Sequence, residues 1–518
     1  MTNDISPRIV NPIFFIRGLE PREPIDLVEP VAKAIELTSK LNLPTTFLVQ
    51  YDALIDSNFT DLLNNLDSRY EVGLWLEMVQ PLIEKAEIKW RGRWAWDWQS
   101  QVSMMVGYSP AEREKIIDVF IEDFRQIFGY YPKSVGSWVL DSHTLGYLAD
   151  KYDITAACNC KDQCGTDGYT LWGGYWNQGY YPSRANAIVP AQDESHQIPV
   201  PVFRMLGSDP IYQYDYSLGE ERQGVVTLEP VYSGGGGCKE WVDWFIDVNF
   251  KSPCLAFGYA QVGQENSFGW PSMQKGIIYQ LEELAKLRDE GVVRIEKLVD
   301  SGEWFKSKFD LTPTTAVTAL SDWQSEGRKS VWYDSRYYRT NLFWEDGKLR
   351  IRDIHLFDQR YPERYLNDTC KSEACTYDAL PVMDGYNWST KDQLAGIRLV
   401  KLVNGKYNPI AGSDPRVSES SDTDLHISWP LVDCGNFEIL CKPDCLEIEN
   451  KGCDWALEMS WSADKSIDLV DVTADSLAYR HEGFDYIVRC SSGHFERRQG
   501  ESVLMLPEDG RIVLNFGE

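Results

Sequence analysis

Strand-like and helix-like segments alternate along the first part of the chain, and this alternation limits the possible folds more than any other feature. Repeated strand–helix units place their strands parallel in one sheet, and about seven of them favour a barrel. Short apolar runs typical of buried strands occur at residues 12–17, 45–50, 70–77, 134–140, 153–157, 224–232 and 254–261.

The clearest helix between these strands has signals at both ends. Ser109 is placed to cap its start, Pro110 stands in the first turn, and Glu112 completes a capping box. Apolar residues follow at helical spacing until Gly129, which is typical of a helix end.

The pattern changes near residues 311–315. Asp346-Gly347 and Asn404-Gly405 each separate two runs of alternating apolar and polar residues, which is the strongest short signal for a β-hairpin. We therefore predict an α/β fold: a distorted (β/α)7 barrel over residues 1–310, then an antiparallel β-rich, sandwich-like region over 311–518. The Ser/Asp-rich stretch at 411–424 is a candidate sub-boundary.

Charge and composition exclude several kinds of partner. The formal net charge of −28 argues against nucleic acid and anionic membrane surfaces, because both are polyanions. Residues 1–20 lack the features of a signal peptide, and no apolar run is long enough to span a bilayer, so we expect a cytoplasmic protein. In a chain of this length the twelve cysteines are expected to be reduced thiols.

Three segments combine aromatic rings with polar groups. GTDGYTLWGGYWNQGYYP at 165–182 is rich in glycine, which breaks both helix and strand periods and predicts a surface loop. KWRGRWAWDWQ and GQENSFGWP have similar chemistry. Such rings suit the apolar face of a sugar, although a loop folded on its own aromatics is the alternative. The rings expected to stack on a sugar are Tyr169, Trp172, Trp176, Trp96 and Trp270.

Carboxylates follow several predicted strands, at the end of a barrel where reactive groups usually lie. Cleavage of a glycosidic bond needs two of them, one as proton donor and one as nucleophile or base. Glu265 lies among polar groups under aromatic cover, which would raise its pKa as a proton donor requires. For Asp141, a role as N-cap of the following helix is as well supported as a catalytic role. The candidate acids are Glu20, Glu77, Asp141, Asp162, Asp167, Asp209, Glu229 and Glu265.

Metal ligands are sparse in the barrel half. It contains only His143 and His196, so a site with several histidines is excluded there. Asp141 and His143 would supply two ligands, but no third is visible. The cysteine spacings differ from those of zinc sites, and Gly234–Gly237 lacks the Lys-Ser/Thr of a phosphate loop. We therefore predict no cofactor.

The order of parts resembles the NodB-like polysaccharide deacetylase superfamily and the related seven-stranded-barrel glycosidases. The strings KWRG, SPAEREK, CNCKD, GTDGYTLWGGYWNQ, GSDPIYQYD and GQENSFGW are more closely similar to bacterial proteins described only as glycoside hydrolase/deacetylase-like. The deacetylases carry an Asp-Asp pair after the first strand and two metal-binding histidines after the third. Here these positions read RGLEPRE, and Trp75, Glu77 and Gln80. In the barrel glycosidases, acids after the fourth and seventh strands correspond to Asp141 and Glu265.

Together these features predict a metal-independent glycoside hydrolase acting on a neutral or acidic oligosaccharide. Glu265 is the expected general acid and Asp141 the nucleophile or base, with Glu77, Glu229, Asp209 and Asp162 as substitutes. Further expected substrate contacts are Arg17, Lys161, Asp162, Gln163 and Asp167. Two alternatives stay open: a deacetylase with an unusual metal set, and a catalytically inactive sugar-binding barrel. The aromatic β-rich half is a candidate surface for a homodimer.

Overall fold

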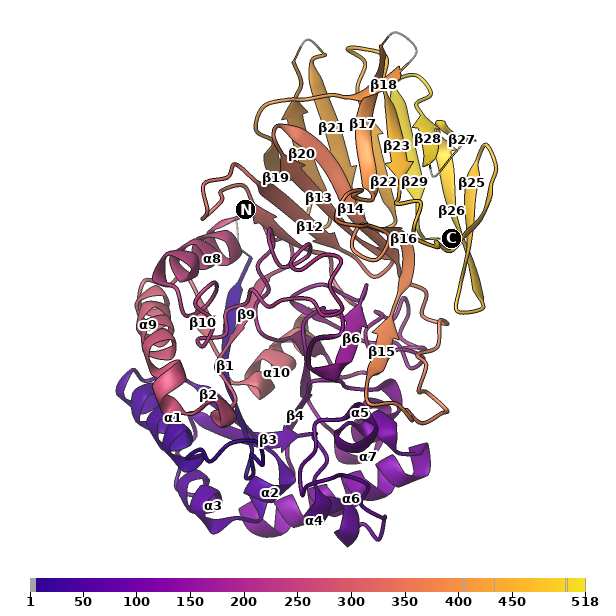
Figure 1. The fold of residues 1–518 in the computed structure, drawn as a ribbon. Helices are drawn as coiled ribbons and strands as arrows, with labels where there is room; N and C mark the ends of the chain where they lie inside the picture. The colour runs from indigo at the N-terminus through magenta and orange to yellow at the C-terminus, as the bar shows by residue number, and fades with distance from the viewer. Residues whose placement is uncertain (1–5, 404–405, 433, 499, 501, 518) are drawn as a thin grey trace.

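A computed structural model describes residues 6–403, 406–432, 434–498, 500 and 502–517 (Figure 1). It shows an α/β domain, drawn in the lower part of the figure, and a β-rich region packed on it, drawn in the upper part. Among the described residues, no helix is long and apolar enough to cross a membrane.

The α/β domain is built on a nearly closed, mostly parallel sheet. In this nine-stranded sheet the order is β9-β1-β2-β3-β4-β5-β8-β7, and β10 also pairs with the start of β1. Only β7 runs antiparallel to its neighbour. Leaving β7 and β10 aside, seven parallel strands remain, as predicted: β1 (Arg8–Ile16), β2 (Thr45–Val49), β3 (Tyr70–Trp75), β4 (Ser134–Ser137), β5 (Ala156–Asn159), β8 (Val202–Arg204) and β9 (Gly258–Val262). The two others are β7 (Gly179–Tyr180) and β10 (Arg294–Ile295).

One predicted strand is wrong. Residues 224–232 form an irregular loop, and the sixth parallel strand is instead β8, which has only 3 residues. Val226 and Leu228 are buried although they lie outside any strand. The apolar run therefore reflects burial of a loop, while β8 is too short to show a period of its own.

Helices surround this sheet (Figure 1). The longer ones are α1 (Val28–Lys40), α6 (Pro110–Phe128), α7 (Ser142–Tyr152), α8 (Lys239–Lys251), α9 (Trp270–Asp289) and α10 (Leu298–Lys308). The shorter ones are α2 (Tyr51–Leu54), α3 (Ser57–Leu63), α4 (Gln80–Lys85) and α5 (Ser100–Ser103). The predicted signals of α6 are confirmed: Ser109 N–H donates to Glu112 at 2.8 Å, and Gly129 adopts φ 81° after the last turn.

Two large antiparallel sheets follow. The first has ten strands, namely β11 (Thr315–Ala319), β12 (Lys329–Asp334), β13 (Tyr338–Glu345), β14 (Lys348–Leu356), β16 (Leu380–Asp384), β17 (Gly396–Val403), β18 (Lys406–Pro409), β23 (Ala456–Ser460), β27 (His494–Arg497) and β28 (Ser502–Leu506). The second has eight, namely β19 (Arg416–Glu419), β20 (Leu425–Pro430), β21 (Asn436–Cys441), β22 (Cys445–Glu449), β24 (Leu469–Val472), β25 (Ser476–His481), β26 (Phe484–Ser492) and β29 (Arg511–Asn515). One hydrophobic cluster contains residues of both sheets, so they pack face to face.

The hairpin predicted at Asp346-Gly347 is confirmed. β13 and β14 pair antiparallel across it, and the two turn residues adopt φ 52° and 66°, as a tight hairpin turn requires. Asn404-Gly405 lies outside the described residues, but the flanking strands β17 and β18 pair antiparallel.

A small parallel sheet connects the two halves of the molecule. β6 (Tyr169–Trp172) comes from the α/β domain, and β15 (Cys375–Asp378) comes from the β-rich region (Figure 1). The core of the α/β domain also includes Trp332 and Phe357 from the β-rich region. The two parts therefore share buried surface.

Candidate active site

A pocket of about 480 Å³ lies where several parallel strands end. Arg17 directly follows β1, Glu77 follows β3, Lys161 follows β5 and Glu265 follows β9. Convergence of strand ends in a barrel explains why residues far apart in sequence meet here. The predicted site residues that line the pocket are Arg17, Glu20, Glu77, Trp96, Lys161, Gln163, Asp167, Tyr169, Glu229 and Glu265.

Arg17 lies between two of the acids. Its Nε and Nη2 donate to the two carboxylate oxygens of Glu77, each at 3.0 Å. Its Nη1 lies 3.0 Å from Oε2 of Glu265 and donates to Ser267 Oγ at 3.1 Å. Burial disfavours the guanidinium charge, but Glu265 and Glu77 outweigh it and raise the pKa of Arg17. Arg17 thus holds both carboxylates in defined positions.

Glu265 is held from a second side as well. Ser267 Oγ donates to its Oε1 at 2.8 Å. Burial raises the pKa of Glu265, Arg17 opposes that rise, and the charge of Glu77 adds to it. The result is an oriented carboxyl group with an increased affinity for a proton.

Glu229 is a second carboxyl group with a raised proton affinity. Burial raises its pKa to about 7, against hydrogen bonds from Thr227 at 2.8 Å and Gln264 at 3.3 Å, and against the charge of Lys161. The charge of Glu265 raises it further. At neutral pH this side chain is therefore shared between its acid and carboxylate forms, which suits proton transfer.

Aromatic rings form one wall of the pocket. The Arg17 guanidinium lies 4.4 Å from the ring centre of Trp96, and Arg22 lies 5.0 Å from Trp96 and 5.3 Å from Trp98. Trp138, which directly follows β4, also lines the pocket. Trp138 and Arg22 were missed in the sequence analysis, although their positions just after β4 and β1 are the signal that identified the acids.

Asp141 does not reach this pocket, so its expected pairing with Glu265 is wrong. It is fully buried and caps α7, accepting from the Thr144 N–H at 2.9 Å and the Thr144 hydroxyl at 2.6 Å. Its other partner is Arg113, at 3.0 Å. The alternative interpretation as a helix cap is confirmed, because its acceptor positions are used within the fold.

Two other candidate acids also lie outside the pocket. Asp209 is buried and accepts from two backbone N–H groups and from Trp241 Nε1 at 2.8 Å. Asp162 is buried and ion-paired with Arg204 and Arg339. The carboxylates of both residues therefore bind groups of the protein itself and do not face a substrate in the pocket.

The glycine-rich aromatic segment at 165–182 is buried in its second half, which corrects the prediction of a surface loop. Trp172 is 4% exposed and donates to Asp384 at 2.9 Å. Trp176 is 6% exposed and stacks on Trp332 with ring centres 4.2 Å apart. Gly173 permits this packing, since a Cβ there would lie 2.4 Å from the His355 ring. These rings pack against the β-rich region, not in the pocket.

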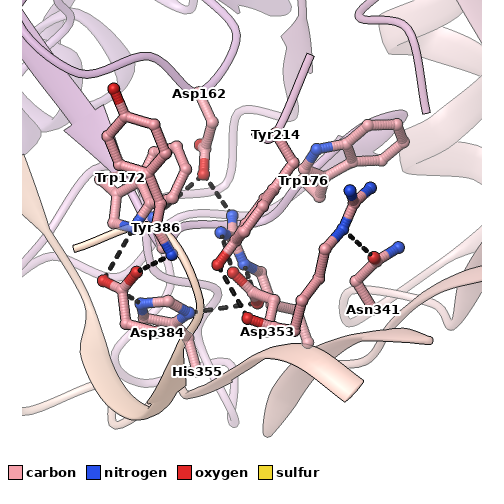
Figure 2. A network of polar contacts seen from close by, with 12 residues as sticks. Asp162, Trp172, Trp176, Tyr214, Asn341, Asp353, His355, Asp384 and Tyr386 are labelled. Atoms are coloured by element: carbon pink, nitrogen blue, oxygen red, sulfur yellow. Dashed lines mark hydrogen bonds and ion pairs between the residues drawn. The ribbon is translucent and has the colours of Figure 1, made fainter. Parts of the chain in front are cut away.

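Figure 2 shows the polar network around these rings. Arg339 bridges Asp162 and Asp353, and its contact with Asp353 measures 2.8 Å. His355 lies 3.1 Å from Asp353. The network joins the end of β5 to the first sheet of the β-rich region. Trp270, the first residue of α9, likewise packs against the core and does not line the pocket.

The pocket does not fit a metal ion. Within the described ranges, no group of three or more His, Cys, Asp or Glu side chains is arranged to hold one. At the position after β3, Glu77 is bound by a guanidinium. Asp141 and His143 point to different partners, Arg113 and Glu114, so they form no pair of ligands.

The fold is that of a nearly closed, mostly parallel α/β barrel followed by antiparallel β-sheets. Residues 100–253 match the family described as "Domain of Unknown Function with solved-structure structure (DUF3863)". No curated protein matches the chain.

Several solved structures are similar to this chain. A "putative glycoside hydrolase/deacetylase" from Parabacteroides distasonis has a TM-score of 0.54 at 15% identity, covering 72% of this chain and 90% of that one. A "putative polysaccharide deacetylase" from Mycobacterium smegmatis has a TM-score of 0.35 at 12% identity, covering 59% and 92%. A "probable Polysaccharide deacetylase" from Pseudomonas aeruginosa has a TM-score of 0.37 at 10% identity, covering 59% and 93%. The first similarity confirms the predicted resemblance in fold, and at this identity it shows the fold alone.

Proposed function

We propose that this protein hydrolyses a glycosidic bond of an oligosaccharide, with Glu229 as proton donor and Glu265 as the second carboxylate. The observation that carries the proposal is that both acids line one pocket with an aromatic wall. This pairing replaces the expected Asp141–Glu265 pair, because Asp141 is buried and caps helix α7.

The proton affinities support these roles. A carboxyl group whose pKa is about 7 is still partly protonated at neutral pH. It can therefore give its proton to the leaving oxygen as the bond to the anomeric carbon breaks. Glu265, oriented by Arg17 and Ser267, then either attacks the anomeric carbon or takes a proton from an attacking water. If Glu265 attacks, Glu229 takes a proton from a water molecule, and that water cleaves the bond between the sugar and Glu265. If Glu265 instead takes the proton from the attacking water, it releases that proton to solvent, and Glu229 regains one from solvent.

The rest of the pocket suits a sugar. Trp98, Trp138 and Phe268 offer apolar surface to the C–H face of a ring, while Gln163 and Ser267 offer hydrogen-bonding groups. A pocket of about 480 Å³ lies within the size range of small-molecule sites.

The test is hydrolysis of a panel of neutral and acidic oligosaccharides, read by product chromatography. Glu229→Gln and Glu265→Gln are each expected to lower turnover about 100-fold or more while leaving binding in place. Asp209→Asn is the control, because Asp209 is an equally buried acid outside the pocket; once shown to be folded, it should retain turnover. Full activity of Glu229→Gln would overturn the role of Glu229. Binding without any product would favour the sugar-binding barrel.

A further inference from the structure

Lys161 is a charged residue of the pocket whose chemistry the proposed reaction does not use. It follows β5, lines the pocket and is 1% exposed. Its ammonium group makes a single hydrogen bond, 3.3 Å long, to the backbone oxygen of Asp162. Within the part of the chain that the structure describes, it has no ion-pair partner.

The other cations of the pocket are satisfied by protein groups. Arg17 is bound by Glu77 and Glu265, and Arg22 is paired with Glu20. A buried ammonium group without a counter-ion is costly unless a partner arrives. Lys161 therefore has donors in the pocket that no protein acceptor uses, and a bound ligand is the group that can reach them.

We propose that Lys161 binds the carboxylate of an acidic sugar, so that the substrates are oligosaccharides containing uronic acids. This inference rests on the proposed function, in that it assigns the ligand class of the same pocket. A carboxylate is the group that a buried ammonium binds most strongly, through a charge-assisted hydrogen bond.

The titratable groups that face Lys161 do not fully balance its positive charge, so an anion can still bind there. They are Cys160, Asp162, Asp167 and Glu229. Asp162 is neutralised by Arg204 and Arg339, and burial raises the pKa of the Cys160 thiol to about 11. Asp167 is exposed to solvent, which weakens its effect.

Glu229 makes anion binding depend on pH. It faces Thr227, Gln264, Lys161 and Glu265, and its pKa is about 7. Below that pH it is mainly neutral and does not repel an incoming carboxylate. Above that pH Glu229 is charged and repels an incoming carboxylate, so anion binding weakens as the pH rises through about 7.

Calorimetry with thio-linked trisaccharides of glucuronate, galacturonate or mannuronate tests the inference, because the sulfur link resists hydrolysis. Each acid is compared with its primary amide, which keeps the rings and removes the charge. We expect at least one acid to bind the full-length protein about 10- to 100-fold more tightly than its amide at pH 5.5. The preference should shrink at pH 8.5.

Variants separate the role of Lys161 from general charge effects. Lys161→Met should abolish the preference for the acid, and Lys161→Arg should keep part of it. Lys33→Met, at an exposed lysine on α1, is the matched control and should change nothing. Equal binding of acid and amide, no binding of any acid, or an unchanged preference in a folded Lys161→Met variant would each overturn the inference. Since no cleavage is measured, failure of the hydrolase proposal shows separately in the turnover assay.

Discussion

Replacing Glu229 by glutamine should make the protein more stable at alkaline pH while it removes the proposed proton donor. In the folded protein burial raises the pKa of Glu229 to about 7, from its ordinary value of 4.5. Between these two values the unfolded chain has released its proton while the folded protein keeps it. Ionisation thus favours the unfolded state, and the stability of the fold falls as the pH rises.

The size of this effect follows from the two pKa values. Below pH 4.5 the side chain is protonated in both states and costs nothing. The cost grows as the pH rises and is complete above about pH 7, where it reaches about 3 kcal/mol. Glutamine carries no charge at any pH, so Glu229→Gln should gain up to that amount at pH 8 and little at pH 4.5.

Urea unfolding of the wild type and Glu229→Gln at pH 4.5 and pH 8, followed by tryptophan fluorescence, measures the difference. Glu303→Gln, at an exposed residue of α10, serves as control and should match the wild type at both pH values. If Glu229→Gln gains no more stability at pH 8 than at pH 4.5, Glu229 does not carry the raised proton affinity on which its role as donor depends.

Three further predictions concern the packing of the two halves and the pocket. Arg339→Met should lower the free energy of unfolding by about 3–5 kcal/mol, because it removes the cation shared by two buried carboxylates. Arg360→Met, at a side chain 73% exposed, should cost less than about 1 kcal/mol, and urea unfolding compares the two variants. Trp176→Ala should cost about 3–5 kcal/mol by opening a cavity between the halves, and increased binding of a hydrophobic dye would report it. Arg17→Met should raise the pKa of Glu265 further, which a pH–rate profile would show as a limb displaced to higher pH.

Local sequence patterns predicted much of the fold, because the residues that favour a particular turn or helix cap stand where the complete fold has that turn or cap. The capping box at Ser109 and the Asp-Gly turn at 346–347 depend only on nearby atoms, and both are confirmed. The parallel strands were also predictable, because strands that are buried on both faces of a sheet appear in the sequence as continuous apolar runs. Strand β8 was missed since three residues are too few to show a period.

The candidate site was predicted less completely, because its composition depends on distant contacts. Rules for strand ends identified Glu77 and Glu265, whereas Glu229 was identified from a predicted strand that is a loop in the structure. The same rules identified Asp141, and its contacts with Thr144 and Arg113 show that it is a helix cap and not a pocket acid. Trp172 lies in a segment with the composition of a sugar-binding loop. In the structure, however, its ring binds Asp384, which lies 212 positions away in the sequence. No local signal distinguishes a ring that meets a ligand from one that meets another part of the chain.

The burial of the aromatic segment also changes what the β-rich region does for the pocket. Lys161 and Asp162 are neighbours at the end of β5, but one lines the pocket and the other joins the network in Figure 2. Asp162 accepts from the Gly173 N–H at 3.0 Å and is paired with Arg339 of β13. The backbone that carries Lys161 is therefore held in place by the β-rich region. Loss of Arg339 should thus loosen the pocket as well as the interface, because precise placement of a binding group depends on the shell behind it.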